Sequence, residues 1–319
     1  MDRRGAICFM MRRVGARAAT QTSAARHDDP ATPEAIAALC AHPRFGDAMR
    51  ASAAGLVALY QGSHLLNWLM DDRGRMLFGY FALYLDVTYD PADAASGLNP
   101  TRLRVMMSEH GICSPGRALA MLSLMRFGGY VAPALQVADR RQRRLVATGK
   151  LVTLLAERWR IHFAAMAPLF ADGPATLVAL DEPRVARALI VTMAERFLAG
   201  FRPMMHAPQL GLFGERNAGL MICCSLLSAG EAGDAVPPSR PVPVSVAGLA
   251  RRFAVSRPHV LKLLRDAEAQ GLIARSGDGV AIAPALADGA RAFFATLYLF
   301  FATCAREAMA ATGQGQRAG

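Results

Sequence analysis

The sequence lacks the short motifs that mark most enzyme active sites. It contains no G-x-S-x-G, no P-loop, no G-x-G-x-x-G after a predicted strand and no H-E-x-x-H. Its seven histidines are scattered, and none stands four residues from another potential ligand with a third in support. We therefore expect no enzymatic activity, no metal site and no cofactor.

Cysteine pairs at the spacing of metal or redox sites are also missing. The six cysteines include no C-x-x-C pair, and Cys223 and Cys224 are adjacent within an apolar run. We expect buried, reduced thiols, which favours a cytoplasmic protein.

Acidic residues are few. The chain has 25 Asp and Glu against 36 Lys and Arg, which gives a net charge of +11. Such a charge suits a polyanionic partner, either nucleic acid or an anionic membrane surface. The most apolar run, Phe293 to Cys304, lies between Arg291 and Arg306 and is too short to cross a bilayer, so we expect no membrane partner.

The two ends of the chain have the composition of tails. Six arginines but one acid, Asp2, occur in the first 26 residues. We expect a disordered basic tail over residues 1–32 and a short disordered tail over 313–319. The abundance of Ala, Arg and Gly throughout is typical of bacterial proteins from genomes of high GC content.

An internal repeat organises the rest of the sequence. The segment from Gly111 to Ala132 aligns without gaps with the segment from Phe253 to Ala274. Ser114 then matches Ser256 and Gly129 matches Gly271, at a constant offset of 142 positions. The chain therefore contains two copies of one structural unit.

Each copy predicts two helices joined by a short turn. The first helix spans about Pro100–His110 or Val246–Phe253, and the second begins after Ser114 or Ser256, which are good N-caps. In the second copy Val260, Leu261, Leu264 and Ala267 form an inward face, which leaves basic side chains on the other.

A β-hairpin follows each second helix. Gly129 and Gly271 end the helices, and short apolar strands surround a turn, which is Asp278-Gly279 in the second copy and an arginine-rich loop in the first. The predicted fold is mainly α with small β-hairpin wings: tandem winged helix-turn-helix modules joined by long apolar helices over Leu151–Leu169 and Leu286–Ala310. Helices over Arg73–Leu85 and Asn217–Ser228 precede the two modules.

This order resembles transcription regulators of the MarR class. The resemblance covers about Pro100–Lys150 and Val244–Leu286, and it is most specific at Val255-Ser256 and Ala269–Ile273. It implies a DNA-binding regulator of transcription in which a long helix after each wing joins two subunits. It also implies a small-molecule effector, for which the methionines would provide an adaptable apolar cavity. These are Met76, Met106, Met107, Met204, Met205 and Met221.

The sequence departs from that class by carrying two modules in one chain. We divide it into a first half over residues 33–175 and a second over 176–312. These halves would form a fused, pseudo-two-fold version of the usual dimer within one chain; a conventional homodimer of the chain stays open.

The resemblance also assigns DNA contacts. In a winged helix the second helix enters the major groove, and wing arginines follow the phosphates or the minor groove. In the second copy the candidates are Ser256, Arg257, His259, Lys262, Arg265 and Arg275. In the first copy they are Arg117 on the helix and Arg140, Arg141, Arg143 and Arg144 on the wing. The second copy would read the sequence of duplex DNA while the first mainly grips it.

Other interpretations remain open. Arginines on a helix or a hairpin are also found on ordinary solvated surfaces. His64 and Trp68 share a helix face that would line an effector pocket or simply pack inward. Winged helices also serve as protein-interaction modules in scaffolds, and tandem ones resemble plasmid or phage replication initiators.

Overall fold

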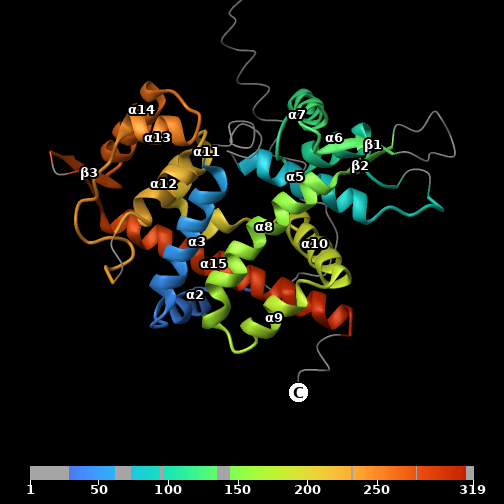
Figure 1. The fold of residues 1–319 in the computed structure, drawn as a ribbon, viewed down its shortest axis with the longest axis horizontal. Helices are drawn as coiled ribbons and strands as arrows, with labels where there is room; N and C mark the ends of the chain where they lie inside the picture. Colours follow the sequence, from blue (N-terminus) through green and yellow to red (C-terminus); the bar gives the residue numbers. More distant parts are fainter. Residues whose placement is uncertain are drawn as a thin grey trace, which may run out of the picture.

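The computed structural model describes residues 29–61, 73–93, 96–134, 144–230, 233–277 and 279–313. Within these ranges the chain is mainly helical, with two separate antiparallel β-hairpins of two strands each. Each hairpin follows a pair of helices joined by a tight turn (Figure 1). The predicted fold class, mainly α with two hairpin wings and long helices between the modules, is confirmed.

The first part of the chain contains one module and ends with a long helix. Its elements are α2 (Pro33–Cys40), α3 (Phe45–Tyr60), α5 (Arg73–Val87), α6 (Pro100–Glu109), α7 (Pro115–Phe127), β1 (Val131–Pro133), β2 (Leu145–Ala147) and α8 (Gly149–Met166). The module is formed by α6, α7, β1 and β2, and the long helix is α8.

The rest of the described chain repeats this order with three short 3₁₀ turns and the short helix α11 added. The elements are η1 (Ala167–Leu169), α9 (Gly173–Ala179), α10 (Pro183–Leu198), η2 (Pro203–His206), η3 (Pro208–Leu210), α11 (Gly211–Glu215), α12 (Gly219–Leu227), α13 (Val246–Arg252), α14 (Arg257–Ala269), β3 (Ile273–Ser276), β4 (Gly279–Ile282) and α15 (Pro284–Ala311).

Local sequence explains where the module helices begin and end. The hydroxyl of Ser114 accepts the backbone N–H of Arg117, and that of Ser256 accepts the N–H of His259, as predicted. Past the helix ends, Gly129 and Gly271 have φ values of 71° and 67°, a left-handed conformation that glycine adopts without strain. The chain then turns directly into each hairpin.

The two hairpins have the register expected of wings. In the first, Val131 pairs with Ala147; in the second, Ile273 pairs with Ile282. Each is extended by a single bridge to an earlier segment, from Leu98 to Leu145 and from Val242 to Val280. The wings are thus anchored to their own modules.

The helices outside the modules pack in reciprocal pairs across the two parts of the chain. Helix α3 packs against α8, and α10 packs in the same way against α15. Across the halves, α3 contacts α12 and α10 contacts α5, while α2 contacts α15 and α9 contacts α8. Figure 1 shows the result: α3, α8 and α15 cross the middle of the molecule, and the two modules lie at opposite ends of its upper edge.

The centre of this helical body contains buried polar groups. The hydroxyl of Tyr298 on α15 donates to the carbonyl of Ala48 (2.8 Å) and forms a second hydrogen bond with the hydroxyl of Ser52 (2.7 Å), both on α3. Ser52 also lies 3.3 Å from Nδ1 of His162 on α8. These contacts join helices from both halves, so the core is shared between them.

Helix α15 corrects one expectation. The apolar run from Phe293 to Cys304 was judged too short to cross a bilayer, but the helix that contains it has 28 residues and is long and apolar enough to do so by length and composition. In its most apolar window 61% of the residues are buried inside the protein. Packing against α2, α8 and α10 accounts for this apolar character.

The predicted boundaries of the halves and tails differ from the observed elements. The boundary between residues 175 and 176 lies inside α9. Residues 29–32, assigned to the N-terminal tail, are part of the structure, since Ala31 is buried and Thr32 caps α2. Residues 1–28 and 314–319 lie outside the described residues, and the division into two domains stays a prediction.

Candidate nucleic-acid interface

The second module presents a helix-turn-helix formed by α13 and α14. Ser245 caps α13 and Ser256 caps α14. Between them the chain reverses at Ala254, whose φ of 56° is a left-handed value rare for a residue with a side chain. The backbone N–H of Val255 bonds the carbonyl of Ala250 and closes this turn.

One face of α14 packs on the module and the other faces solvent. The buried residues are Val260, Leu263, Leu264 and Ala267. Leu261, which the sequence pattern placed on the inward face, is only half-buried, and Leu263 takes its place. The predicted cationic face is exposed at Arg257, Lys262 and Arg265, within an arc of about 140° around the helix.

Asp266 organises part of this basic face. Its carboxylate accepts hydrogen bonds from Nζ of Lys262, at 3.1 and 3.2 Å, and from the guanidinium of Arg216 at 3.2 Å. Arg216 follows α11, so the contact ties α14 to the body of the second half. Lys262 still has 64% of its side chain exposed, so it remains accessible to a ligand.

His259 is turned toward the protein. Its Nε2 lies 2.9 Å from the carbonyl of Asn217, and the residue is half-buried. In this position the ring helps to fix the beginning of α14 against the segment before α12. It is a weaker candidate for DNA contact than its neighbours.

The wing carries a paired arginine. The guanidinium of Arg275 donates to the Glu268 carboxylate at 2.8 and 2.6 Å, and its backbone N–H donates to the same group at 3.0 Å. These hydrogen bonds from Arg275 lower the pKa of Glu268. The pair fixes the wing relative to the end of α14.

Two cations of α14 are not engaged by the protein. Among the described residues, neither Arg257 nor Arg265 has a hydrogen bond or an ion pair. The sequence pattern did not single out two more basic residues beside them, Arg251 and Arg252, which are exposed at the end of α13. The sequence signal for them is their position in the last turn of the first helix, next to the inter-helix turn.

The first module has the same geometry but a different surface. Arg117 is exposed in the first turn of α7, as predicted, yet the outer side of this helix is largely apolar. Leu119 is 41% exposed and Phe127 is 87% exposed. Basic side chains exposed nearby are Arg104 on α6 and Arg126 on α7, neither of which was predicted as a site residue.

Most of the predicted wing arginines of the first module cannot be placed. Arg140, Arg141 and Arg143 lie outside the described residues. The guanidinium of Arg144 lies over the ring of Tyr89, 3.3 Å from its centroid, and the residue is half-buried. This position directs Arg144 against its own module and does not favour contact with DNA.

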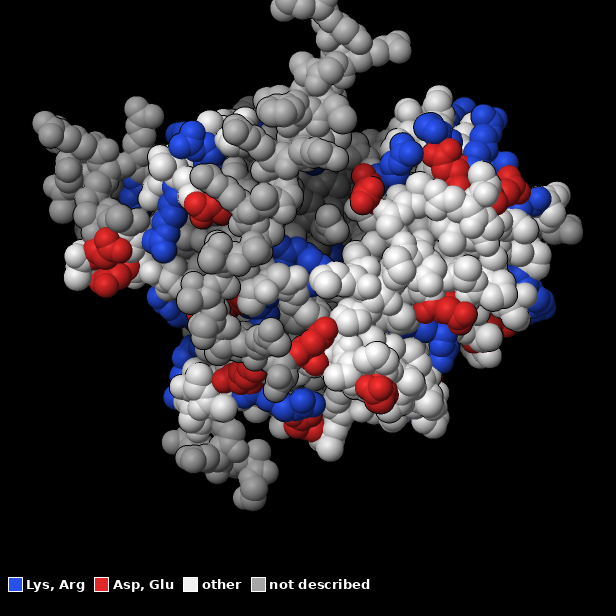
Figure 2. Space-filling view, turned by 180° about the vertical axis from the view of Figure 1, so that it is seen from behind, with Lys and Arg blue, Asp and Glu red and all other residues white. Residues whose placement is uncertain are grey.

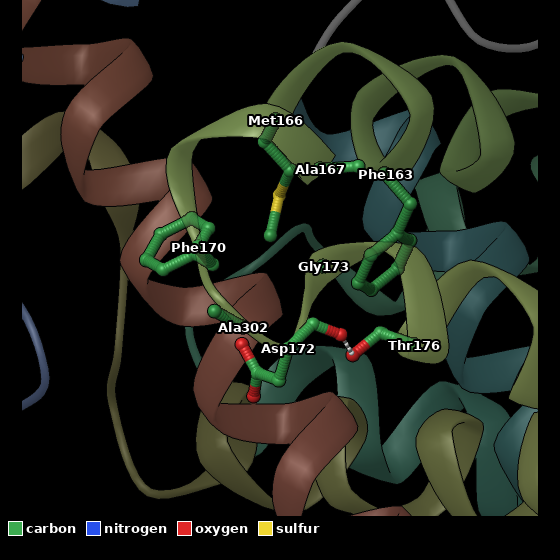
Figure 3. Close-up of a pocket in the computed structure, with 8 residues that line it drawn as sticks. All are labelled: Phe163, Met166, Ala167, Phe170, Asp172, Gly173, Thr176 and Ala302. Atoms are coloured by element: carbon green, nitrogen blue, oxygen red, sulfur yellow. Dashed lines mark hydrogen bonds between the residues drawn. The ribbon is translucent and has the colours of Figure 1, made fainter.

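Two pockets lined by described residues are both smaller than an effector site would be. One, of about 10 Å³, lies where α8, η1, α9 and α15 meet and has room for no more than a water molecule (Figure 3). Its wall includes Phe163, Met166 and Phe170, and Thr176 donates to the carbonyl of Asp172 at 2.9 Å. A surface pocket of about 190 Å³ lies beside Arg196, Phe201 and Met205. Both are smaller than the roughly 300 Å³ of a typical ligand site.

The methionines predicted to line such a cavity are dispersed. Met107 and Met221 are buried, Met106 and Met204 are half-buried, and Met205 is 69% exposed. His64 and Trp68 and the side chain of Met76 lie outside the part of the chain that can be described. An effector site therefore stays a prediction.

Reactive groups are not concentrated in the described structure. Within these residues no three His, Cys, Asp or Glu side chains are placed to hold a metal ion. Cys223, Cys224 and Cys304 are buried, as predicted, whereas Cys40 and Cys113 are half-buried. Burial raises the pKa of the Cys224 thiol to about 12, which disfavours the reactive thiolate.

Charge is distributed unevenly over the surface. Figure 2, seen from behind, shows Lys and Arg side chains at the upper right end, over the module that holds α13 and α14, with Asp and Glu between them. The acids there include Asp266 and Glu268, which pair with Lys262 and Arg275. The second module thus has a basic surface in which carboxylates hold Lys262 and Arg275.

Comparison with family models, with curated proteins and with solved structures gave no match. The geometry of the two modules is therefore the basis for a functional inference.

Proposed function

We propose that this protein is a DNA-binding transcription regulator, similar to the MarR class, that reads duplex DNA with its second module. The observation that carries the proposal is the outer face of α14: an N-capped second helix of a helix-turn-helix that exposes Arg257, Lys262 and Arg265. A helix of this kind fits the major groove, where Arg and Lys bond to guanine edges and phosphates.

The neighbouring groups would have positioning roles. Arg251 and Arg252 at the end of α13 would contact phosphates, which hold a recognition helix in register without reading sequence. Glu268 would keep Arg275 extended and ordered before DNA arrives. The order of this side chain lowers the entropic cost of binding.

The reciprocal packing supports a fused pseudo-dimer. Each half contributes a helix pair, α3 with α8 or α10 with α15, and each half packs against the α5 or α12 helix of the other. A symmetric dimer makes every such contact twice. One chain would then form the complete DNA-binding unit, with the second module as the reader.

The test is DNA binding by a paired substitution. Full-length protein is used to select bound fragments from random and genomic DNA at physiological salt, and fluorescence anisotropy then compares the selected duplex with a random one. We expect Arg257→Ala with Lys262→Ala to reduce the preference for the selected duplex about tenfold or more, because each lost base contact contributes roughly 1–3 kcal/mol.

A matched control removes equal charge elsewhere. Arg160 and Arg184 have 58% and 56% of their side chains exposed, away from both modules. Their double substitution by alanine should leave the preference unchanged. If the α14 variant keeps full selectivity, α14 is not the reading helix; if no duplex is bound at any salt concentration, the proposed function is wrong.

A further inference from the structure

Helix α7 carries an exposed apolar stripe. Gly116, Ala120, Ser123 and Phe127 lie within about 60° of one another around the helix axis, with Leu119 beside them. Phe127 has the largest exposed fraction, 87%, among the exposed large hydrophobic residues of the described chain. The opposite face of α7 is fully used, since Ala118, Met121, Leu122 and Met125 are buried in the module.

Two of the corresponding positions in α14 carry a positive charge. At the offset of the internal repeat, Ala120 corresponds to Lys262 and Ser123 to Arg265. The two helices have the same length, the same serine cap and the same place before a wing. The stripe on α7 therefore does not have the charge that phosphates attract, although its position matches that of a reading helix.

The composition of the stripe suits another helix. Small side chains at 116, 120 and 123 allow a second backbone to approach closely, and Leu119 and Phe127 provide apolar area to bury. Isolated exposed apolar residues are common, but here Leu119, Ala120 and Phe127 form one continuous face with Gly116 and Ser123 on one helix.

Charge selects the partner. Arg117 and Arg126 flank the stripe on opposite sides, and α7 contains no acidic residue. The α7 helix of a second copy would bring no carboxylate to pair with these arginines. A partner helix with carboxylates on both sides of its own apolar stripe would instead complement Arg117 and Arg126.

We infer that the outer face of α7 binds a partner protein through an amphipathic helix whose apolar stripe is bordered by Asp or Glu. The first module would thus recruit a protein while the second binds DNA. This inference uses α7 alone and does not depend on the role proposed for α14.

The experiment uses full-length protein and three synthetic peptides. The first is a labelled helical peptide with leucines on one face and glutamates on both sides of that face. The second has lysines in place of the glutamates, and the third has the first peptide's composition in scrambled order. Fluorescence anisotropy should show binding of the first peptide, with Kd at least about tenfold higher for the other two.

Variants locate the binding face. Phe127→Ala should raise the Kd of the acidic peptide about tenfold. Arg126→Glu should raise the Kd of the acidic peptide and lower the Kd of the lysine peptide. Val178→Ala is the matched control, since Val178 is a 72% exposed apolar residue on α9. This variant should bind the acidic peptide with the same Kd as the wild type. Circular dichroism confirms that each variant is folded.

Three results would overturn the inference. The first is equal peptide binding by wild type and Phe127→Ala, or no binding at all. The second is sedimentation showing that the wild type self-associates and Phe127→Ala does not, which would make a second copy the occupant. The third is loss of DNA affinity in Phe127→Ala with unchanged peptide binding. The variant with Arg257→Ala and Lys262→Ala separates this inference from the DNA proposal. It should bind the acidic peptide like the wild type, whether or not it binds DNA.

Discussion

Asp266 shows how a single carboxylate sets the charge of the candidate reading helix. It bonds both Lys262 and Arg216, so it neutralises part of the face that would meet phosphates. For Asp266→Asn we expect severalfold tighter binding to random duplex DNA at low salt, because one negative charge is lost and Lys262 is released. The slope of log K against log salt should steepen by about one.

Anisotropy titrations over a series of salt concentrations measure this slope. Asp181→Asn is the control, since Asp181 is a 61% exposed acid paired with Arg160 away from the modules. An unchanged slope for Asp266→Asn would mean that DNA does not approach this side of α14.

His162 makes the stability of the protein depend on pH. Burial lowers the pKa of this imidazole well below 6.5, and the positive charge of Arg158 lowers it further. The folded protein thus keeps His162 neutral, while the unfolded chain takes up a proton as the pH falls below 6.5. Stability from this residue is fully present above that pH and is lost as the pH falls toward the folded pKa.

We expect about 1 kcal/mol of unfolding free energy to be lost between about pH 7.5 and about pH 5.5 through His162. Urea unfolding at a series of pH values measures it. His162→Gln will have its own stability, but its unfolding free energy should vary less over this range. An identical pH dependence in both proteins would show that folding does not shift the pKa of His162.

At the scale of elements, the end of α14 depends on a glycine. Gly271 has a φ of 67°, and a Cβ there would have no atom within 4 Å. Gly271→Ala should therefore destabilise the protein by about 1 kcal/mol through backbone strain alone. Urea denaturation provides the measurement.

Gly116 is the natural comparison for that substitution. It lies inside α7 without a left-handed φ, and a Cβ added there would also meet only open space. Gly116→Ala should be neutral or stabilising by about 0.5 kcal/mol, because alanine favours the helix. Equal losses in both variants would contradict the strain argument.

At the scale of the whole molecule, reciprocal packing predicts the stoichiometry of the DNA complex. If the two halves act as a fused dimer, one chain should occupy one complete site, and that site should be asymmetric because α7 and α14 differ. Analytical ultracentrifugation with a selected duplex should give one chain per duplex. A palindrome that binds one chain per half-site would refute the fusion.

Much of this architecture follows from the sequence alone because the relevant interactions are local. Ser114 and Ser256 cap their helices through atoms three residues away, and Gly129 and Gly271 end them through their own backbone freedom. The repeat at a fixed offset therefore predicts both helix-turn-helix units and both wings. The exposed basic face of α14 follows from helical periodicity for the same reason.

Contacts between distant residues were decided only by the tertiary structure. The bonds from Arg216 to Asp266 and from His259 to Asn217 join segments 50 and 42 residues apart, so no local pattern announces them. Reciprocal packing of α3 on α12 and of α10 on α5 likewise depends on the assembled core. The apolar face of α7 became visible only when burial separated it from the core face, because the helix is apolar on both sides.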